Sequence, residues 1–385
     1  MLDLQPKVHI DPEDMKCLYL LTSPCLGIQS LTLLLADTTW DGDRLLVHCY
    51  PHTRVCPQHK SRLRSLRIHL DDTSVTDWGM KHAIPSLLRL HPHLEAFALN
   101  VNGGELSSGV GLQTLVRALC KHITLRDLEL HFSRCDLPDT SVLAKLRCLS
   151  RLEKLCIDLS ENPSLYGRTA VGLQHMLSPS LISLNLNYLR TQIPDLDFSG
   201  LHLRLSSLEA LTFKVLRPSC PGILSETFPL SLKSLRLDIA RVRLGGPSCH
   251  CLGRGLRQFA CLRRLFIDMH NTLLRDIGLC TLVRAIMSLP ELHNIDLRLQ
   301  CNLITHCGVQ SILTLVQSPL LTDIRIDLSD NPLGFLGTTA IVSWAILQTR
   351  KYLLILLHNV YPLCDVEESQ VYRMVPPHQR HLLLF

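Results

Sequence analysis

Apolar and polar residues follow one recurring order along this chain, and residues 321–347 show it most clearly. Between Ile324 and Leu328 every second residue is apolar, as expected of a half-buried β-strand. Asn331 and the proline after it mark a turn, and Gly337 follows shortly afterwards in the sequence. An apolar run with helical spacing then continues to Leu347. The stretch therefore predicts a strand, a turn and a helix.

The same unit recurs ten times, with first leucines spaced by 24 to 31 residues. A fixed period of this size predicts a solenoid, in which each repeat buries its apolar face only against its neighbours. The predicted strands begin near Leu63, Leu94, Leu125, Leu152, Leu181, Leu208, Leu232, Leu262, Leu292 and Leu321.

Four segments are expected. Residues 1–30 predict an N-terminal cap, with a helix that starts at Asp11-Pro12. Residues 31–62 hold a first strand over 31–35 and then an irregular insertion that contains cysteine and histidine. Residues 63–349 hold the repeats, and residues 350–385 predict a C-terminal cap with one more strand-like run over 353–357. Repeats 181–207 and 208–231 lack a clear helix and depart from the pattern.

Three repeats end their strand with asparagine, in LSENP (159–163), LQCN (299–302) and LSDNP (328–332). Together with the LxxLxIxL strands, these motifs resemble leucine-rich repeats of the ribonuclease-inhibitor type. The resemblance implies an α/β horseshoe of about ten to twelve repeats, with a parallel sheet on the concave face and helices on the convex face. It also implies that the asparagine bonds the backbone of the turn. Glycines begin the predicted helices at Gly79, Gly111, Gly167, Gly278, Gly308 and Gly337.

Composition narrows the class of protein. The chain has 385 residues, of which 46% are hydrophobic and 5% aromatic, so aliphatic side chains must fill the core. A net charge of +5 is far from that of a dedicated nucleic-acid-binding domain. The 16 cysteines show no secreted-type spacing, and Cys120, Cys261, Cys280 and Cys307 occupy positions of small apolar residues. With no signal peptide or membrane span in the sequence, we expect reduced thiols and an intracellular, cytoplasmic protein.

The residues between the strand leucines are expected to face the concave surface, because alternate strand side chains point to opposite faces. Basic and acidic residues are nearly balanced there, which suits another protein better than a phosphate backbone. Phe266 is the predicted anchor, because aromatic rings among charges are typical of binding hot spots. The predicted partner-binding residues are Arg236, Asp238, Phe266, Asp268, Asp296, Arg298, Arg325 and Asp327. Solvated strand positions without a partner are the alternative.

Cys49, His52, Cys56 and His59 form a second candidate site. Two thiols and two imidazoles within eleven residues supply the ligands of a tetrahedral zinc site. The spacing differs from that of zinc fingers, whose ligand pairs are separated by a longer loop. A surface loop without metal is the alternative, and no other cofactor is expected.

The third feature is a basic segment, residues 232–275. It is interpreted either as a surface that contacts RNA or as a solvated rim without a ligand. Phosphate-binding, nucleophile-elbow and HExxH motifs do not occur. His131 and Asp158 fall in one column, where an acid–base pair is geometrically possible. The sequence therefore favours a non-catalytic scaffold or recognition module that binds a protein. The alternatives are an RNA-associated structural component of a ribonucleoprotein complex and, from the resemblance, a regulator of a GTPase or nuclease.

Overall fold

The computed structural model describes residues 2–4, 28–35, 41–48, 61–165, 175–191, 205–214, 229–346 and 352–360. The chain forms two compact units, residues 1–197 and 198–385. Their boundary falls in the stretch where the sequence departs from the repeat pattern.

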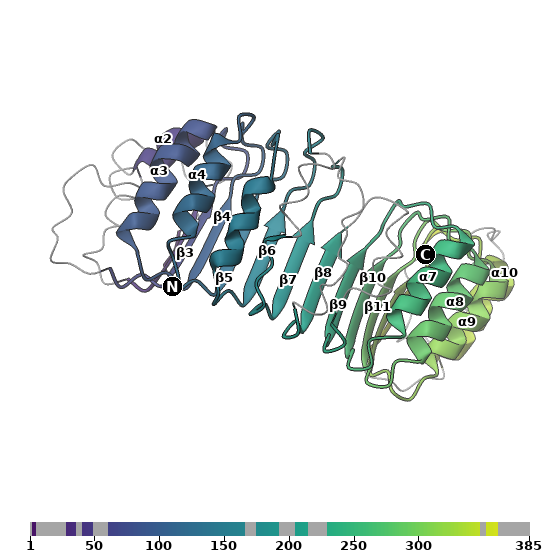
Figure 1. Cartoon of the computed structure of the whole chain (residues 1–385). Helices are drawn as coiled ribbons and strands as arrows, with labels where there is room; N and C mark the ends of the chain where they lie inside the picture. Colours follow the sequence, from purple (N-terminus) through teal and green to yellow (C-terminus); the bar gives the residue numbers. More distant parts are fainter. Residues whose placement is uncertain are drawn as a thin grey trace. The chain divides into compact units, whose positions relative to one another are not determined.

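The first unit is a parallel sheet in which each strand pairs with the next one along the chain. Helices lie along one face of this sheet and pack against their neighbours in sequence (Figure 1). The strands are β1 (Leu2–Leu4), β2 (Ser30–Leu34), β3 (Ser65–His69), β4 (Ala96–Asn100), β5 (Asp127–His131), β6 (Lys154–Asp158) and β7 (Ser183–Asn187). The helices are α2 (Gly42–His48), α3 (Asp77–Leu90), α4 (Val110–Leu119) and the 3-10 helix η2 (Ser141–Cys148).

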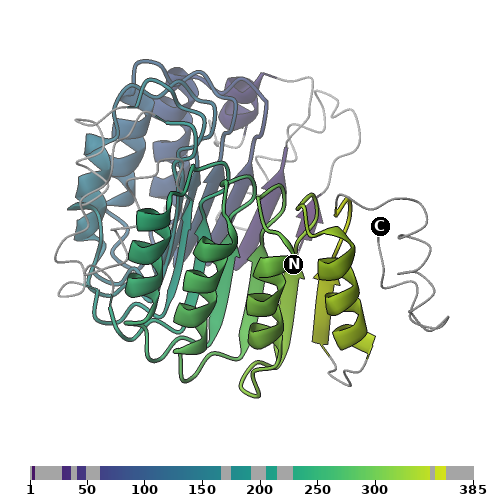
Figure 2. The same cartoon turned by 90° about the vertical axis from the view of Figure 1, so that its right-hand side faces the viewer.

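The second unit repeats this plan. Its strands also pair in parallel and in chain order. Its helices stand side by side on one face of the sheet (Figure 2). The strands are β8 (Ala210–Lys214), β9 (Ser234–Asp238), β10 (Arg264–Asp268), β11 (Asn294–Arg298), β12 (Asp323–Asp327) and β13 (Tyr352–Leu356). The helices are α7 (Gly246–Leu256), α8 (Asp276–Met287), α9 (His306–Val316) and α10 (Gly334–Ile346).

The predicted α/β solenoid organisation, one parallel strand per repeat, is confirmed. A strand occupies every predicted position, including the run at 353–357, most of which lies in β13. Leu265 and Ile267 of β10 are buried beneath the helices, whereas Phe266 and Asp268, which alternate with them, remain partly exposed. Alternation along each strand thus places side chains either in the core or on the face of the sheet opposite the helices. We call this second face the open face.

Buried asparagines tie neighbouring repeats together. The amide of Asn302 accepts backbone N–H bonds from Thr272 and Leu274 of the preceding repeat, at 3.0 Å each. It also donates to the carbonyls of Met269 and Leu299, at 2.8 and 2.9 Å. Asn162 and Asn331 make equivalent bonds. The predicted role of the motif asparagines is therefore confirmed.

At Gly79, Gly111 and Gly308 an aspartate from the preceding repeat lies against the start of the helix and leaves no room for a Cβ. Asp276 accepts bonds from the backbone N–H and hydroxyl of Thr305, at 2.8 and 2.7 Å, and so caps the start of α9. A Cβ on Gly308 would collide with the same carboxylate. Asp77 holds Gly111 of α4 in the same way, through a 2.7 Å bond from its N–H. Gly167 lies outside the described residues.

Two expectations are wrong in detail. The segment 36–62 is not irregular throughout, because α2 occupies Gly42–His48 and packs on α3. Cys261 and Cys307 are exposed rather than packed, and among the described cysteines the buried thiols are those of Cys135 and Cys249. The predicted helix at Asp11 and the C-terminal cap beyond residue 360 lie outside the described residues.

Candidate interaction surface

Four strands of the second unit place the predicted partner-binding residues in two straight rows. Parallel pairing without register shift aligns Phe266 with Arg236 on one side and Asp296 on the other. The next row aligns Asp268 with Asp238 and Arg298 in the same way. The rows end on β12 at Arg325 and Asp327. All eight side chains therefore share the open face of this unit.

Phe266 does not stand alone on this surface. The guanidinium carbon of Arg236 lies 3.7 Å from the centre of the Phe266 ring, and that of Arg298 lies 5.0 Å from it. These are cation–π contacts, each contributing about 0.5–1 kcal/mol at an exposed site. The surface therefore presents an arginine–phenylalanine–arginine cluster, with one arginine from each neighbouring strand, rather than a bare apolar ring.

Asp268 and Asp327 are held by the turns that follow their strands. The carboxylate of Asp268 accepts the N–H of His270 at 3.1 Å, and it pairs with Arg298 at 3.6 Å. Asp327 accepts the N–H of Ser329 at 3.0 Å and the Gln300 amide at 2.6 Å. Because backbone donors orient them, the acids present fixed negative charge. Arg298 and Arg325 are 47% and 61% exposed and remain free to reorient toward a ligand.

A hollow of about 230 Å³ lies at the β11–β13 end of these rows. Asp296, Arg298, Arg325 and Asp327 line it, together with Gln300, Leu354 and Leu356. The last three were not predicted, although the strand-like run at 353–357 was the signal that could have identified the two leucines. Burial raises the pKa of Asp296, and the guanidiniums of Arg298, Arg325 and Arg236 oppose that shift.

The basic segment 232–275 does not form one track. Lys233 and Arg263 precede their strands and pair with Glu209 and Glu291, at 2.6 and 3.1 Å. Arg254 lies on α7, and Arg257 caps its C-terminal end. Arg241, Arg243 and Arg275 lie in the turns that follow β9 and β10. The positive charge is thus divided among the segments before the strands, the turns after the strands and the helix layer.

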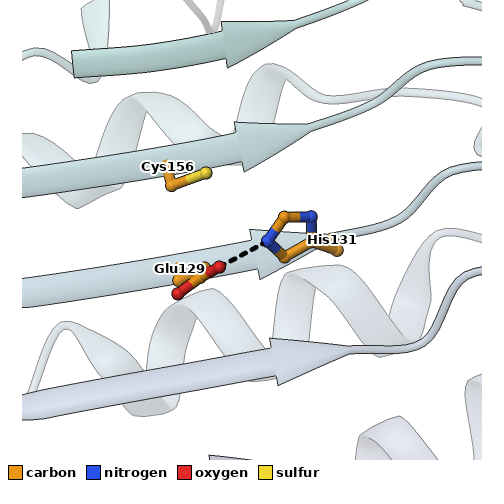
Figure 3. A group of neighbouring side chains, drawn as sticks. All are labelled: Glu129, His131 and Cys156. Carbon is orange, nitrogen blue, oxygen red and sulfur yellow. Dashed lines mark hydrogen bonds and ion pairs between the residues drawn. The ribbon is translucent and has the colours of Figure 1, made fainter. Parts of the chain in front are cut away.

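The first unit carries a polar cluster that the sequence only partly indicated. His131 Nδ1 lies 4.0 Å from Asp158, and its Nε2 bonds Glu129 at 2.8 Å, with Cys156 beside them on the next strand (Figure 3). Bonding to His131 lowers the pKa of Glu129 despite its burial. Burial by itself would lower the pKa of His131, but the Cys156 sulfur and the Glu129 carboxylate raise it to about 10. The predicted zinc ligands Cys49, His52, Cys56 and His59 lie outside the described residues.

The architecture defines an α/β repeat solenoid, and no helix among the described residues is long and apolar enough to cross a membrane. No protein-family model matches the sequence, and no curated protein resembles it. Among solved structures, the chain is similar to one titled "Crystal structure of Rad7 and Elc1 complex in yeast". The TM-score is 0.42 and the sequence identity 15%, over 82% of this chain and 78% of that chain.

Proposed function

We propose that this chain is a non-catalytic protein-interaction module of the leucine-rich-repeat, ribonuclease-inhibitor-like type. Its partner is a protein that binds the open face of the second unit. The observation that supports this most strongly is the Arg236–Phe266–Arg298 cluster, next to the Asp268 carboxylate that a backbone N–H orients. Arginine and aromatic side chains are the residues most enriched at interface hot spots.

The pattern of charge favours a protein over a nucleic acid. Each row carries both signs of charge, with Asp296 between Phe266 and Arg325 in one row and Arg298 between Asp268 and Asp327 in the other. A phosphate backbone laid over these rows would therefore meet repulsion at the aspartates. A partner protein with its own acids and bases would complement both signs. The dispersal of residues 232–275 over separate edges removes the continuous basic track on which the RNA alternative depends.

An intracellular, reducing compartment is part of the proposal. The ten cysteines of the described residues are free thiols, and several of them are exposed. Exposed free thiols are typical of reducing compartments, since disulfides form readily in oxidising ones.

The test is affinity purification of the full chain, followed by mass spectrometry, with two matched double variants. Phe266→Ala with Asp268→Lys removes the ring and reverses one charge on the open face. Ile277→Ala with Arg284→Glu makes equivalent changes on α8, where Ile277 is 81% exposed. We expect the first variant to lose partners that the second retains, while both keep the wild-type melting temperature. Equal retention by both variants would reject the open face as the binding surface.

A further inference from the structure

We propose a second site, independent of the partner surface: Glu129, His131 and Cys156 on the open face of the first unit bind a zinc ion. The carboxylate oxygen, the imidazole nitrogen and the thiol sulfur all lie within 4.8 Å of one another. They meet on two adjacent strands (Figure 3).

The strand register creates this juxtaposition. β5 and β6 pair so that Glu129 lies beside Cys156 and His131 lies beside Asp158. Residues two apart on one strand share a face, and neighbouring strands lie about 4.8 Å apart. Four side chains that each carry a metal-binding atom therefore lie next to one another on the open face.

The donor set suits zinc. Carboxylate, imidazole and thiolate are the three ligand types that tetrahedral Zn²⁺ takes from proteins, at about 2.0–2.3 Å from the metal. Ligand atoms around such an ion lie roughly 3.5 Å apart. The 2.8 Å bond between His131 and Glu129 would open slightly, and the sulfur would move inward. His131 and Glu129 are 22% and 29% exposed, so an ion can enter from solvent.

Surrounding residues already orient these three ligands. Asp158 lies 4.0 Å from the other imidazole nitrogen of His131, on the side where a carboxylate accepts a hydrogen bond in carboxylate–histidine–zinc arrangements. Asp158 is itself held by Asn187 at 2.8 Å. Arg67 pairs with the second carboxylate oxygen of Glu129 at 3.3 Å and leaves the first oxygen directed at His131.

Asn185 gives a further indication. Its Nδ2 donates to the Cys156 sulfur at 3.2 Å, whereas its buried Oδ1 has no hydrogen-bond partner among the residues that the structure describes. Three protein ligands leave one position of a tetrahedral zinc ion open to water. A water molecule there, next to the sulfur, would supply the donor that this oxygen lacks.

The experiment uses the purified full chain after treatment with chelator. Because the segment that holds Cys49 and Cys56 carries its own candidate ligands, every measurement is made in a Cys49→Ser, Cys56→Ser background. Co²⁺ is added as a spectroscopic substitute for zinc, and Zn²⁺ affinity is measured by calorimetry. We expect one equivalent of metal and a thiolate-to-cobalt charge-transfer band.

The variants separate the proposed site from adventitious binding. Cys156→Ser should abolish the charge-transfer band, and His131→Ala should weaken zinc binding by more than about 100-fold, since loss of an outer-shell partner alone costs 10–100-fold. Asp158→Asn should fall within that outer-shell range. The controls are Cys261→Ser and His250→Ala, which change exposed residues of the second unit and should have no effect.

Circular dichroism of each variant without metal shows whether the fold is retained. Zinc binding that is equal in Cys156→Ser, His131→Ala and the two controls would overturn the proposal, as would absence of metal binding from the Cys49→Ser, Cys56→Ser protein. Either result would leave the cluster as an ion pair with a neighbouring thiol. Partner capture by the second unit does not enter this test, so the two proposals fail separately.

Discussion

Replacement of Asn302 by alanine tests how the repeats are held together. The Asn302 side chain is 3% exposed and makes hydrogen bonds to two neighbouring turns. In the alanine variant, the backbone N–H groups of Thr272 and Leu274 lose their acceptor in a buried site. An orphaned buried donor costs about 1–3 kcal/mol. Because water entering the vacated space would satisfy part of this loss, we expect destabilisation of about 3 kcal/mol.

Urea unfolding monitored by circular dichroism measures the effect, with the m-value showing whether unfolding stays cooperative. The matched control is Gln310→Ala, which removes an exposed amide from α9 and should change stability by less than about 0.5 kcal/mol. For a unit of this size, about 3 kcal/mol corresponds to a drop of roughly 6–12 °C in melting temperature. If Asn302→Ala unfolds at the same urea concentration as Gln310→Ala, the asparagine does not join the repeats.

Two further predictions concern packing and pH. A Cβ on Gly308 would meet the Asp276 carboxylate, whereas one on Gly253 of α7 would have its nearest neighbour at an ordinary 3.4 Å. Gly308→Ala should therefore lower the free energy of unfolding by about 1–3 kcal/mol, whereas Gly253→Ala should raise it by about 0.5–1 kcal/mol. Thermal melts of the two variants measure these changes. A change of the same sign in both variants would contradict this packing. Burial lowers the pKa of His122 below its ordinary value of 6.5, so the folded state binds this proton more weakly than the unfolded state. The stability that His122 contributes should be retained above pH 6.5 and lost as the pH falls below it. The His122→Asn variant should therefore lose less stability than the wild type between pH 7 and 5. An identical loss in the two proteins would show that His122 does not titrate in this way.

Much of the fold could be predicted from the sequence, because the leucine period specifies both the strands and their faces. Leu265 and Ile267 identify the buried side of β10, and so Phe266 is assigned to the open face without coordinates. The motif asparagines were equally informative. The α2 helix was missed because it has only seven residues, too few to show a period.

The chemistry of the open face was harder to predict, because it depends on side-chain directions across strands. Sequence alternation identified Arg236 and Phe266 as neighbours, but it could not show a guanidinium over the ring at 3.7 Å. Glu129 and Cys156 occupy the same position in consecutive repeats, so the repeat alignment already places them on adjacent strands, as β5 and β6 do. The alignment could not show that their ligand atoms lie within 4.8 Å of one another and of the His131 imidazole. Their grouping with His131 therefore required the structure.

Site-directed photo-cross-linking of the full chain in its native complex tests directly whether the partner protein binds the open face of the second unit. A photoreactive phenylalanine analogue is introduced at position 266 on the open face or, in a separate protein, at position 336 on α10, where Leu336 is 68% exposed. We expect covalent capture of the partner protein from position 266 and none from position 336. Capture from position 336 alone would show that the partner binds the helix side, and the proposed surface would be wrong.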